Sequence, residues 1–452
     1  MMEPLALGIG GLVVLAALIA LRMPVAFAMI LVGAGGTSLL YGPAILLGQL
    51  KTLAFGQFSI YDLSVVPLFV LMGAFATRAG MSGDLFRAAR AWLGRQRGGV
   101  AMAGIAACAG FGAVCGSSLA TASTMGRVAL PELLRYGYAP RLAAGSLAAG
   151  GVLGILIPPS VVLVIYAVIV EASIVALFMA ALVPGLLAVL LFMITIGLLV
   201  RLDPDLAPRA EAVDRKELVG ASLAVLPVLA VFGLVIGGMY AGFYNPTPAA
   251  SVGAFLVGLM WLYRRGFNLA ELKDALLETG RTTAMIYLIV LGAELLKIFM
   301  ARAGVPQAAA AWIGGQGFDP LLVMVMLLVA LILLGCLMDS LSMILLVIPF
   351  FWPMLVEING GLYQGAEGAA FGLSTEDLKI WFGILALIVV ELGLITPPVG
   401  MNVFVISALA RDIPMGEIFR GVMPFFLAEI LRVVLLLAFP ALALWLPARL
   451  GG

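Results

Sequence analysis

The sequence has no histidine, only three cysteines and little charge. The absence of histidine argues against His-based metal sites and histidine acid–base chemistry. The cysteines at 108, 115 and 336 lie in apolar segments and match no zinc or redox spacing, so we expect them to be small buried hydrophobic residues. Charged residues make up 11% of the 452 residues, about half the share that is typical of a soluble protein.

Further absences exclude other classes of protein. The net charge of +1 suggests no nucleic-acid partner. The sequence has no Gly-x-x-x-x-Gly-Lys-Ser/Thr loop, so we expect no ATPase site of its own. The N-terminal stretch lacks a basic region of the kind that opens a cleaved signal peptide, and we expect it to be the first span. No long polar stretch remains for a soluble domain, which favours a single membrane domain.

Apolar residues are abundant, at 63% of the chain. Runs of roughly 20 such residues recur from end to end, and each is long enough to cross a bilayer. We therefore expect an all-α integral membrane protein of about ten spans. The expected spans are 5–21, 24–42, 62–79, 140–170, 173–200, 217–241, 246–263, 281–303, 378–410 and 415–447.

Two further apolar stretches, 99–131 and 319–356, are too long for one span. Each has a small or polar break in its middle, CGSSLATAST at 115–124 and CLMDSLSM at 336–343. Such a stretch is either two tight spans or a hairpin that enters and leaves the membrane on one side, and we expect re-entrant hairpins. The shorter, more polar segments 43–60 and 266–280 resemble amphipathic helices at the membrane interface, with plain loops as the alternative.

The distribution of basic residues predicts the orientation of the chain. If the N-terminus lies outside, most of the 25 Lys and Arg residues fall on the inner side, as the positive-inside rule requires. The loop 357–377 then lies outside, and it carries four acidic residues and no basic one. This count predicts on which side of the membrane each loop lies, but it does not distinguish hairpins from paired spans.

The two halves of the chain resemble each other. Leu153–Pro159 resembles Leu392–Pro398 at an offset of 239, and the turn at Ser117–Leu119 aligns with Asp339–Leu341 at an offset of 222. Chance similarity between glycine-rich apolar segments is the alternative. Each half would cross the membrane five times, and because five is odd the second half would be inserted upside down. Inverted repeats with interrupted helices recur in secondary transporters, whose site lies between the repeats.

We therefore divide the chain into two inverted repeats. The first, 1–203, contains the hairpin 99–131 and a broken helix at 140–170. The second, 217–452, contains the hairpin 319–356 and a broken helix at 378–410. Each broken helix carries a Pro-Pro pair, which removes two backbone donors and forces the helix to open. Exposed backbone at membrane depth is tolerated only where it lines a cavity or is buried in protein.

Opened helices predict where ligands bind. Freed carbonyl oxygens suit a sodium ion, whereas freed amides at a helix N-terminus suit an anion. We expect two pseudo-equivalent sodium cages, formed by Ser117, Ser118, Gly154, Ile157 and Pro158 in the first half and by Asp339, Ser340, Gly393 and Thr396 in the second. We expect substrate ligands among Ser118, Thr121, Ser340, Ser342 and Asn402.

Several of these residues also have a structural interpretation. A charge at the bilayer centre is costly and usually marks an ion or substrate path, which favours Asp339 as a ligand, but it could instead cap the outgoing helix. The serines could serve helix packing. Glu391 could take a proton, or it could have a structural role in holding the broken helix in place, and we favour the structural role. Glu294 and Lys297, spaced i,i+3, are expected to pair with each other.

Together these motifs resemble a known family. The turn CGSSLATASTMG, the breaks GILIPPS and ELGLITPPVGMN, and the segment NPTPAASVGA are similar to the large membrane subunit of tripartite ATP-independent periplasmic (TRAP) transporters. The similarity runs across nearly the whole chain, and the motifs arrive in family order.

The resemblance implies an elevator-type transporter in a bacterial inner membrane, with a periplasmic N-terminus. It implies uptake of a carboxylate-bearing small molecule with sodium ions as coupling ions and no covalent cofactor. Its implied partners are a small four-helix TRAP membrane subunit and a periplasmic substrate-binding protein, besides the lipid bilayer.

Three alternatives remain. A stand-alone sodium/dicarboxylate-type symporter shares the expected architecture. A passive channel can also place two hairpins at the midplane, but usually without a carboxylate-bearing cage. An intramembrane enzyme would need a nucleophile and base or a metal cluster; with no histidine and no paired carboxylates, we expect no enzyme.

Overall fold

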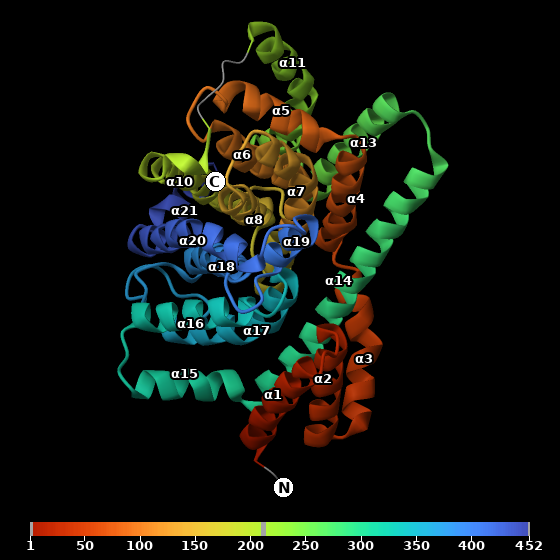
Figure 1. The fold of residues 1–452 in the computed structure, drawn as a ribbon. Coiled ribbons are helices and arrows are strands. Elements are labelled where there is room, and N and C mark those ends of the chain that lie inside the picture. Colours follow the sequence, from red (N-terminus) through yellow and green to blue (C-terminus); the bar gives the residue numbers. More distant parts are fainter. Residues whose placement is uncertain (1–2, 209–213, 451–452) are drawn as a thin grey trace.

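The computed structural model describes residues 3–208 and 214–450, and within them every regular element is helical (Figure 1). Seven helices are long and apolar enough to cross a membrane, or eight if a bent pair counts as one span. The expected all-α, multi-pass membrane protein is therefore confirmed. Arg209, which the orientation argument counts on the inner side, lies outside the described residues.

The elements follow one another closely along the chain. In order they are α1 (Pro4–Ala20), α2 (Val25–Tyr41), α3 (Pro43–Phe58), the 3-10 turn η1 (Tyr61–Ser64), α4 (Val65–Arg78), α5 (Met81–Leu93), α6 (Gly99–Cys115), α7 (Ser118–Arg135), α8 (Pro140–Leu156), α9 (Val161–Val170), α10 (Ile174–Leu202), the 3-10 turn η2 (Pro204–Leu206), α11 (Arg215–Phe232), the π turn η3 (Gly233–Gly237), α12 (Gly238–Tyr240), α13 (Pro246–Arg265), α14 (Leu269–Ala303), α15 (Val305–Gly315), α16 (Pro320–Gly335), α17 (Ser340–Asn359), α18 (Thr375–Gly393), α19 (Met401–Leu409), α20 (Met415–Ala438) and α21 (Ala441–Leu450).

The longest helix, α14, spans 35 residues, about 50 Å at the usual rise per residue. It runs along one side of the molecule from the end of α13 to α1 and α2 (Figure 1). It packs extensively on α2 and α4. The approach to α2 needs a glycine, because a Cβ on Gly33 would lie 2.6 Å from the backbone carbon of Leu295. We call α1–α4, α13 and α14 the scaffold group.

The interface segments differ from each other. Segment 43–60 is helical, as α3, and none of the residues of that helix is buried. The prediction of a separate element at 266–280 is wrong, because α14 begins at Leu269 and runs without a break into the expected span. The side chain of Asn268 caps the helix by accepting from the amides of Ala270 and Glu271. With the cap at 268 and no proline after it, nothing interrupts the helix before the apolar part at 281–303.

The two long apolar stretches each fold into a pair of short helices in contact. Only two residues separate α6 from α7, and four separate α16 from α17. The helices α6 and α16 have 17 and 16 residues, about 25 Å, which is less than the roughly 30 Å of a hydrocarbon core. These are helical hairpins, with tips at 116–117 and 336–339.

The broken helices are also present. The pair α8 and α9 is bent by 45°, and α18 is separated from α19 by residues 394–400. The prediction of one helix over 415–447 is wrong, because α20 ends at Ala438 and α21 begins at Ala441. Pro440, which has no amide hydrogen to donate, lies in this gap.

The two halves exchange contacts. The second part of each broken helix packs on the hairpin of the other half, α9 against α17 and α19 against α7. We call the hairpins, the broken helices and α20 the hairpin group. Its interior contains a fully buried ion pair between Arg432 and Glu429, and Arg432 also donates to the carbonyl oxygen of Pro184 at 3.1 Å. Such a pair is tolerated in the interior because each charge compensates the other.

Candidate functional site

The first hairpin tip is shaped by its glycine and serines. Gly116 has φ +65°, a conformation that favours glycine, and a Cβ there would lie 3.0 Å from the carbonyl oxygen of Pro159 in the first break. Ser117 caps α7 by accepting from the amide of Ala120 at 3.4 Å. The tip of the first hairpin therefore lies directly against the first broken helix, as expected.

The second tip has a carboxylate where the first has a serine. Asp339 is the N-cap of α17, and one of its oxygens accepts from the amide of Ser342 at 3.1 Å. The structure therefore shows Asp339 capping α17, as the structural interpretation predicts. The cap uses one carboxylate oxygen, and the residue also lines a cavity, so its role as a sodium ligand remains a prediction.

Both tips meet at one buried carboxylate. Glu391, near the end of α18, is fully buried. The hydroxyl of Ser118 donates to its Oε2 and the hydroxyl of Ser340 donates to its Oε1. Glu391 thus has the structural role that we favoured. Its hydrogen bonds, however, link the two hairpins to each other and do not only hold the broken helix in place. The sequence gives no sign of these two contacts.

The hairpin tips and the broken helices converge on a cavity of about 420 Å³. One wall is formed by the tips, with Ser117, Ser118, Asp339 and Ser340, and by the first turns of α9 and α19. The opposite wall comes from the scaffold group: Gly73 and Thr77 of α4, and Glu278, Thr282, Met285 and Ile286 of α14. Arg78 forms an ion pair with Glu278 at 3.0 Å. The sequence analysis missed this scaffold wall, although the i,i+4 spacing of Glu278 and Thr282 places them on one helix face.

Behind the first tip lies a small group of oxygen atoms. A Cβ on Gly154 would lie 2.5 Å from Thr121 Oγ1 and 2.8 Å from the carbonyl oxygen of Ser117. Among the described residues the fully buried Thr121 hydroxyl has no hydrogen-bond partner, and such a group is costly unless something binds it. These oxygens fit an oxygen-coordinated cation such as sodium. Ile157 is the C-cap that follows α8, packs near Gly185 and is followed by Pro158 in the break.

Of the residues predicted for the second cage, Asp339 and Ser340 line the cavity, whereas Gly393 and Thr396 do not. Gly393 packs on the end of α16, where a Cβ would lie 2.5 Å from the backbone of Gly335. The hydroxyl of Thr396 donates to the carbonyl oxygen of Leu392 at 2.7 Å, which leaves its lone pairs free. Asn402 instead donates to the carbonyl oxygen of Ala148 in α8 at 3.3 Å, on the side of the first hairpin. Ser342 and Asn402 are buried and do not line the cavity.

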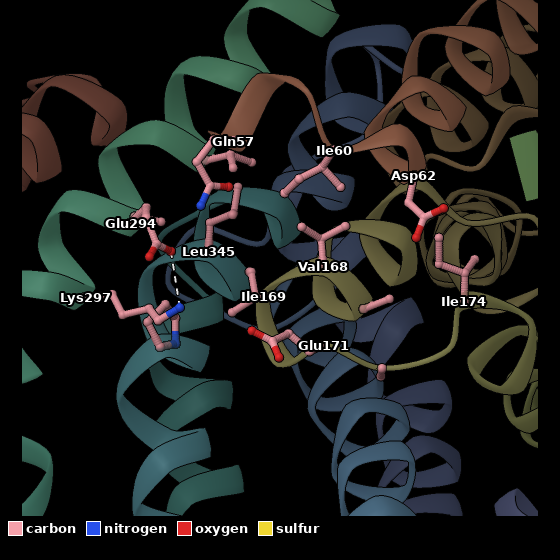
Figure 2. Close-up of a pocket in the computed structure, with 15 residues that line it drawn as sticks. Gln57, Ile60, Asp62, Val168, Ile169, Glu171, Ile174, Glu294, Lys297 and Leu345 are labelled. Atoms are coloured by element: carbon pink, nitrogen blue, oxygen red, sulfur yellow. Dashed lines mark hydrogen bonds and ion pairs between the residues drawn. The ribbon is translucent and has the colours of Figure 1, made fainter. Parts of the chain in front are cut away.

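A second cavity, of about 410 Å³, separates the two groups of helices elsewhere (Figure 2). Its scaffold side includes Gln57, Asp62 and the expected ion pair between Glu294 and Lys297, which is confirmed at 3.2 Å. Its other side is the end of α9 with the loop after it, and α17. Glu278 and Glu294 lie 16 residues apart on α14, about 24 Å along the helix. The scaffold helix α14 therefore borders both cavities.

Comparisons with known proteins agree with these features. Residues 12–442 match the family "Tripartite ATP-independent periplasmic transporter, DctM component". The chain is 34% identical to the C4-dicarboxylate TRAP transporter large permease protein DctM of Pseudomonas aeruginosa, over 92% of each chain. It is 30% identical to the sialic acid TRAP transporter large permease protein SiaM of Vibrio cholerae, over 95% of this chain and 96% of that one.

A solved structure with the same fold is that of the YdaH transporter of Alcanivorax borkumensis. It has a TM-score of 0.61 at 16% identity and covers 97% of this chain and 98% of its own. The fold is thus that of a membrane transporter.

Proposed function

The chain belongs to the DctM component family of the TRAP transporters, and on that basis we propose that it performs sodium-coupled uptake of an organic acid. The solute would be delivered by a periplasmic substrate-binding protein and carried by an elevator motion. The observation that carries this proposal is the cavity at which both hairpin tips and both broken helices meet. Like its relatives, which are named as permeases, the chain is not an enzyme.

Sodium coupling is supported by the oxygen atoms of the first tip. The buried Thr121 hydroxyl and the Ser117 carbonyl oxygen lie close together at Gly154. We assign Ser117, Ser118, Gly154, Ile157 and Pro158 to the first sodium cage, with Thr121 beside them. A second cage would use Asp339, Ser340, Gly393 and Thr396.

A carboxylate-bearing solute is supported by the relatives and by the tips. The relatives named above take C4-dicarboxylates and sialic acid, and the carboxylate is the group that those solutes share. Ser118 and Ser340 are the first residues of α7 and α17, so the cavity lies at two helix N-termini, where amides and the helix dipole favour an anion. Thr121, Ser342 and Asn402 lie behind that surface.

An elevator motion is supported by the two cavities. Four separate elements hold the proposed site, so local gating alone would dismantle it, whereas moving the hairpin group as a unit would not. The scaffold helix α14 borders one cavity at Glu278 and the other at Glu294. A hairpin group that slides along α14 would exchange one cavity for the other and carry the site across the membrane. The two inverted repeats, 1–203 and 217–452, would supply the symmetry for this exchange.

The proposal includes two partner chains and an orientation. We expect a small four-helix membrane subunit and a binding protein, as in the family. We place the chain in a bacterial inner membrane with its N-terminus in the periplasm, because basic residues such as Arg87, Arg135 and Arg264 then lie on the cytoplasmic side.

The test is reconstitution of this chain, with its small subunit, into proteoliposomes, and measurement of solute uptake with the loaded binding protein outside. We expect accumulation above equilibrium that requires an inward sodium gradient and stops when an ionophore removes the gradient. Uptake that only equilibrates would indicate a passive channel. Concentrative uptake without any binding protein would indicate a stand-alone symporter.

A further inference from the structure

Glu391 is a single carboxylate that serves both halves of the molecule. Its two oxygens each accept one hydrogen bond, one from Ser118 in the first hairpin and one from Ser340 in the second. These partners are 273 and 51 residues away along the chain. The repeat offset of 239 aligns Glu391 with Val152, so the first half has no matching carboxylate. The arrangement is therefore asymmetric, with one acceptor for two equivalent donors.

The two donors stand at equivalent places. Ser118 is the first residue of α7 and Ser340 the first of α17, and each follows its helix cap. Both also line the cavity of about 420 Å³, whereas Glu391 does not. A serine hydroxyl has one hydrogen and two acceptor lone pairs. Because each hydrogen points back to Glu391, the lone pairs of both serines are left for a group in front of the tips.

The surroundings of Glu391 favour this role. The side chain is fully buried among helices of the hairpin group. The other buried charges nearby are Arg432 and Glu429 of α20, which packs on α18. A buried carboxylate is strongly destabilising unless it receives hydrogen bonds, and the serine hydroxyls supply them. Removing either serine therefore alters the environment of the carboxylate on which the other serine depends.

We propose that Glu391 is a positioning residue that couples the two hairpin tips, by holding both serine hydroxyls with their lone pairs toward the cavity. A cation bound at one tip draws on that serine's lone pairs and strengthens its hydrogen bond to Glu391. That change reaches the other serine through the shared carboxylate, so the two tips respond to cations together. The inference rests on the proposed sodium coupling, because it assigns the sodium cooperativity to one residue that touches neither cation nor solute. Outer-shell partners of this kind typically change metal affinity by about 10- to 100-fold.

The test uses Glu391→Gln, which keeps the size of the side chain but cannot accept from both serines through carboxylate oxygens. We expect the purified complex to assemble, the sodium concentration for half-maximal uptake to rise about tenfold, and the Hill coefficient for sodium to fall toward 1. Sodium-dependent thermal stabilisation of the complex, measured without transport, is expected to weaken in parallel. Ser146→Ala is the matched control, because this buried serine bonds only to Ala143 in its own helix.

A cycle of serine variants gives the decisive measurement. In wild type, Ser118→Ala and Ser340→Ala should be non-additive in sodium affinity, and in the Glu391→Gln background they should become additive. Additive effects in the wild-type background overturn the inference. This measurement does not require the Glu391→Gln protein to fold. A Glu391→Gln protein with unchanged affinity and Hill coefficient overturns it as well, while sodium-driven uptake itself stands. Wild-type uptake that ignores sodium overturns the proposed function, and this inference with it.

Discussion

Asn402 of α19 donates a hydrogen bond from its side-chain amide to the carbonyl oxygen of Ala148 in α8, at 3.3 Å. The two residues are 254 positions apart and belong to the two different broken helices. The bond is fully buried, and a Cβ on the neighbouring Gly151 would lie 2.9 Å from the same amide nitrogen. It holds the second half of the chain against the first, beside the first hairpin.

Replacing Asn402 by leucine tests whether this residue has a structural role, through its hydrogen bond to α8, or is a substrate ligand. We expect Asn402→Leu to lower the free energy of unfolding by about 1 kcal/mol through loss of the bond. The KM for solute should stay unchanged, because the side chain does not line the cavity. Thermal unfolding and uptake kinetics check the two expectations. A KM that rises about tenfold with unchanged stability would instead indicate that the Asn402 amide binds the solute.

Thr121→Val replaces a hydroxyl by a methyl of the same shape. Among the described residues this buried hydroxyl has no partner, so we expect the variant to be as stable as wild type in the absence of sodium, or more stable by about 1 kcal/mol. If the hydroxyl binds sodium, the half-saturating sodium concentration should rise about tenfold, equivalent to about 1.4 kcal/mol.

The control for that experiment is Thr37→Val in α2. Thr37 is also buried with an unpartnered hydroxyl, but it belongs to the scaffold group. We expect it to leave the sodium response unchanged. Equal sodium responses in wild type and Thr121→Val would remove Thr121 from the first cage.

Asp339→Asn separates capping from cation binding. Asparagine caps a helix as well as aspartate does, so α17 should form and the complex should assemble. The loss of the negative charge should raise the half-saturating sodium concentration by about tenfold or more, which sodium titration of uptake measures. Asp319→Asn is the matched control, because Asp319 caps the other helix of the same hairpin, accepting from Leu321 at 2.8 Å. Identical effects of the two variants would mean that Asp339 acts only as a cap.

Labelling of single cysteines tests the topology. In a background in which alanine replaces Cys108, Cys115 and Cys336, a membrane-impermeant maleimide should label Tyr363→Cys from outside the cell. Arg135→Cys should react only after the membrane is opened, because α7 is expected to end on the cytoplasmic side. Tyr363 and Arg135 are both exposed in the structure, so both sites can be reached. Labelling of both from one side would contradict the inverted arrangement.

The proposed elevator motion predicts opposite changes at two positions on α14. In the same background, Thr282→Cys borders the cavity at the tips and Glu294→Cys borders the second cavity. When sodium and solute are added to proteoliposomes, the labelling rate should rise at one position and fall at the other, because in the proposed motion the hairpin group would uncover one cavity as it covers the other. Rates that change in the same direction would indicate local gating.

The sequence by itself determined most of the helices and the two breaks at the Pro-Pro pairs, but it missed α5, α15 and the gap between α20 and α21. These properties depend on neighbours in the chain: long apolar runs make membrane helices, and Pro-Pro pairs remove the donors that a helix needs. The hairpin tips at Gly116 and Asp339 could be located in this way, as could the pairing of Glu294 with Lys297, because i,i+3 residues share a helix face. The continuity of α14 was missed because polarity alone suggested a boundary at 281, where no residue ends a helix.

Only the tertiary structure decided which groups meet. Glu391 could be singled out as a buried charge, but its two serine partners lie on helices remote from it in the chain. Asn402 follows the second break in sequence, yet it contacts α8 of the first half. Glu278 and Thr282 become a wall of the cavity only when α14 packs across the tips. Such contacts depend on how helices far apart in the chain pack together, and no local pattern of residues encodes that packing.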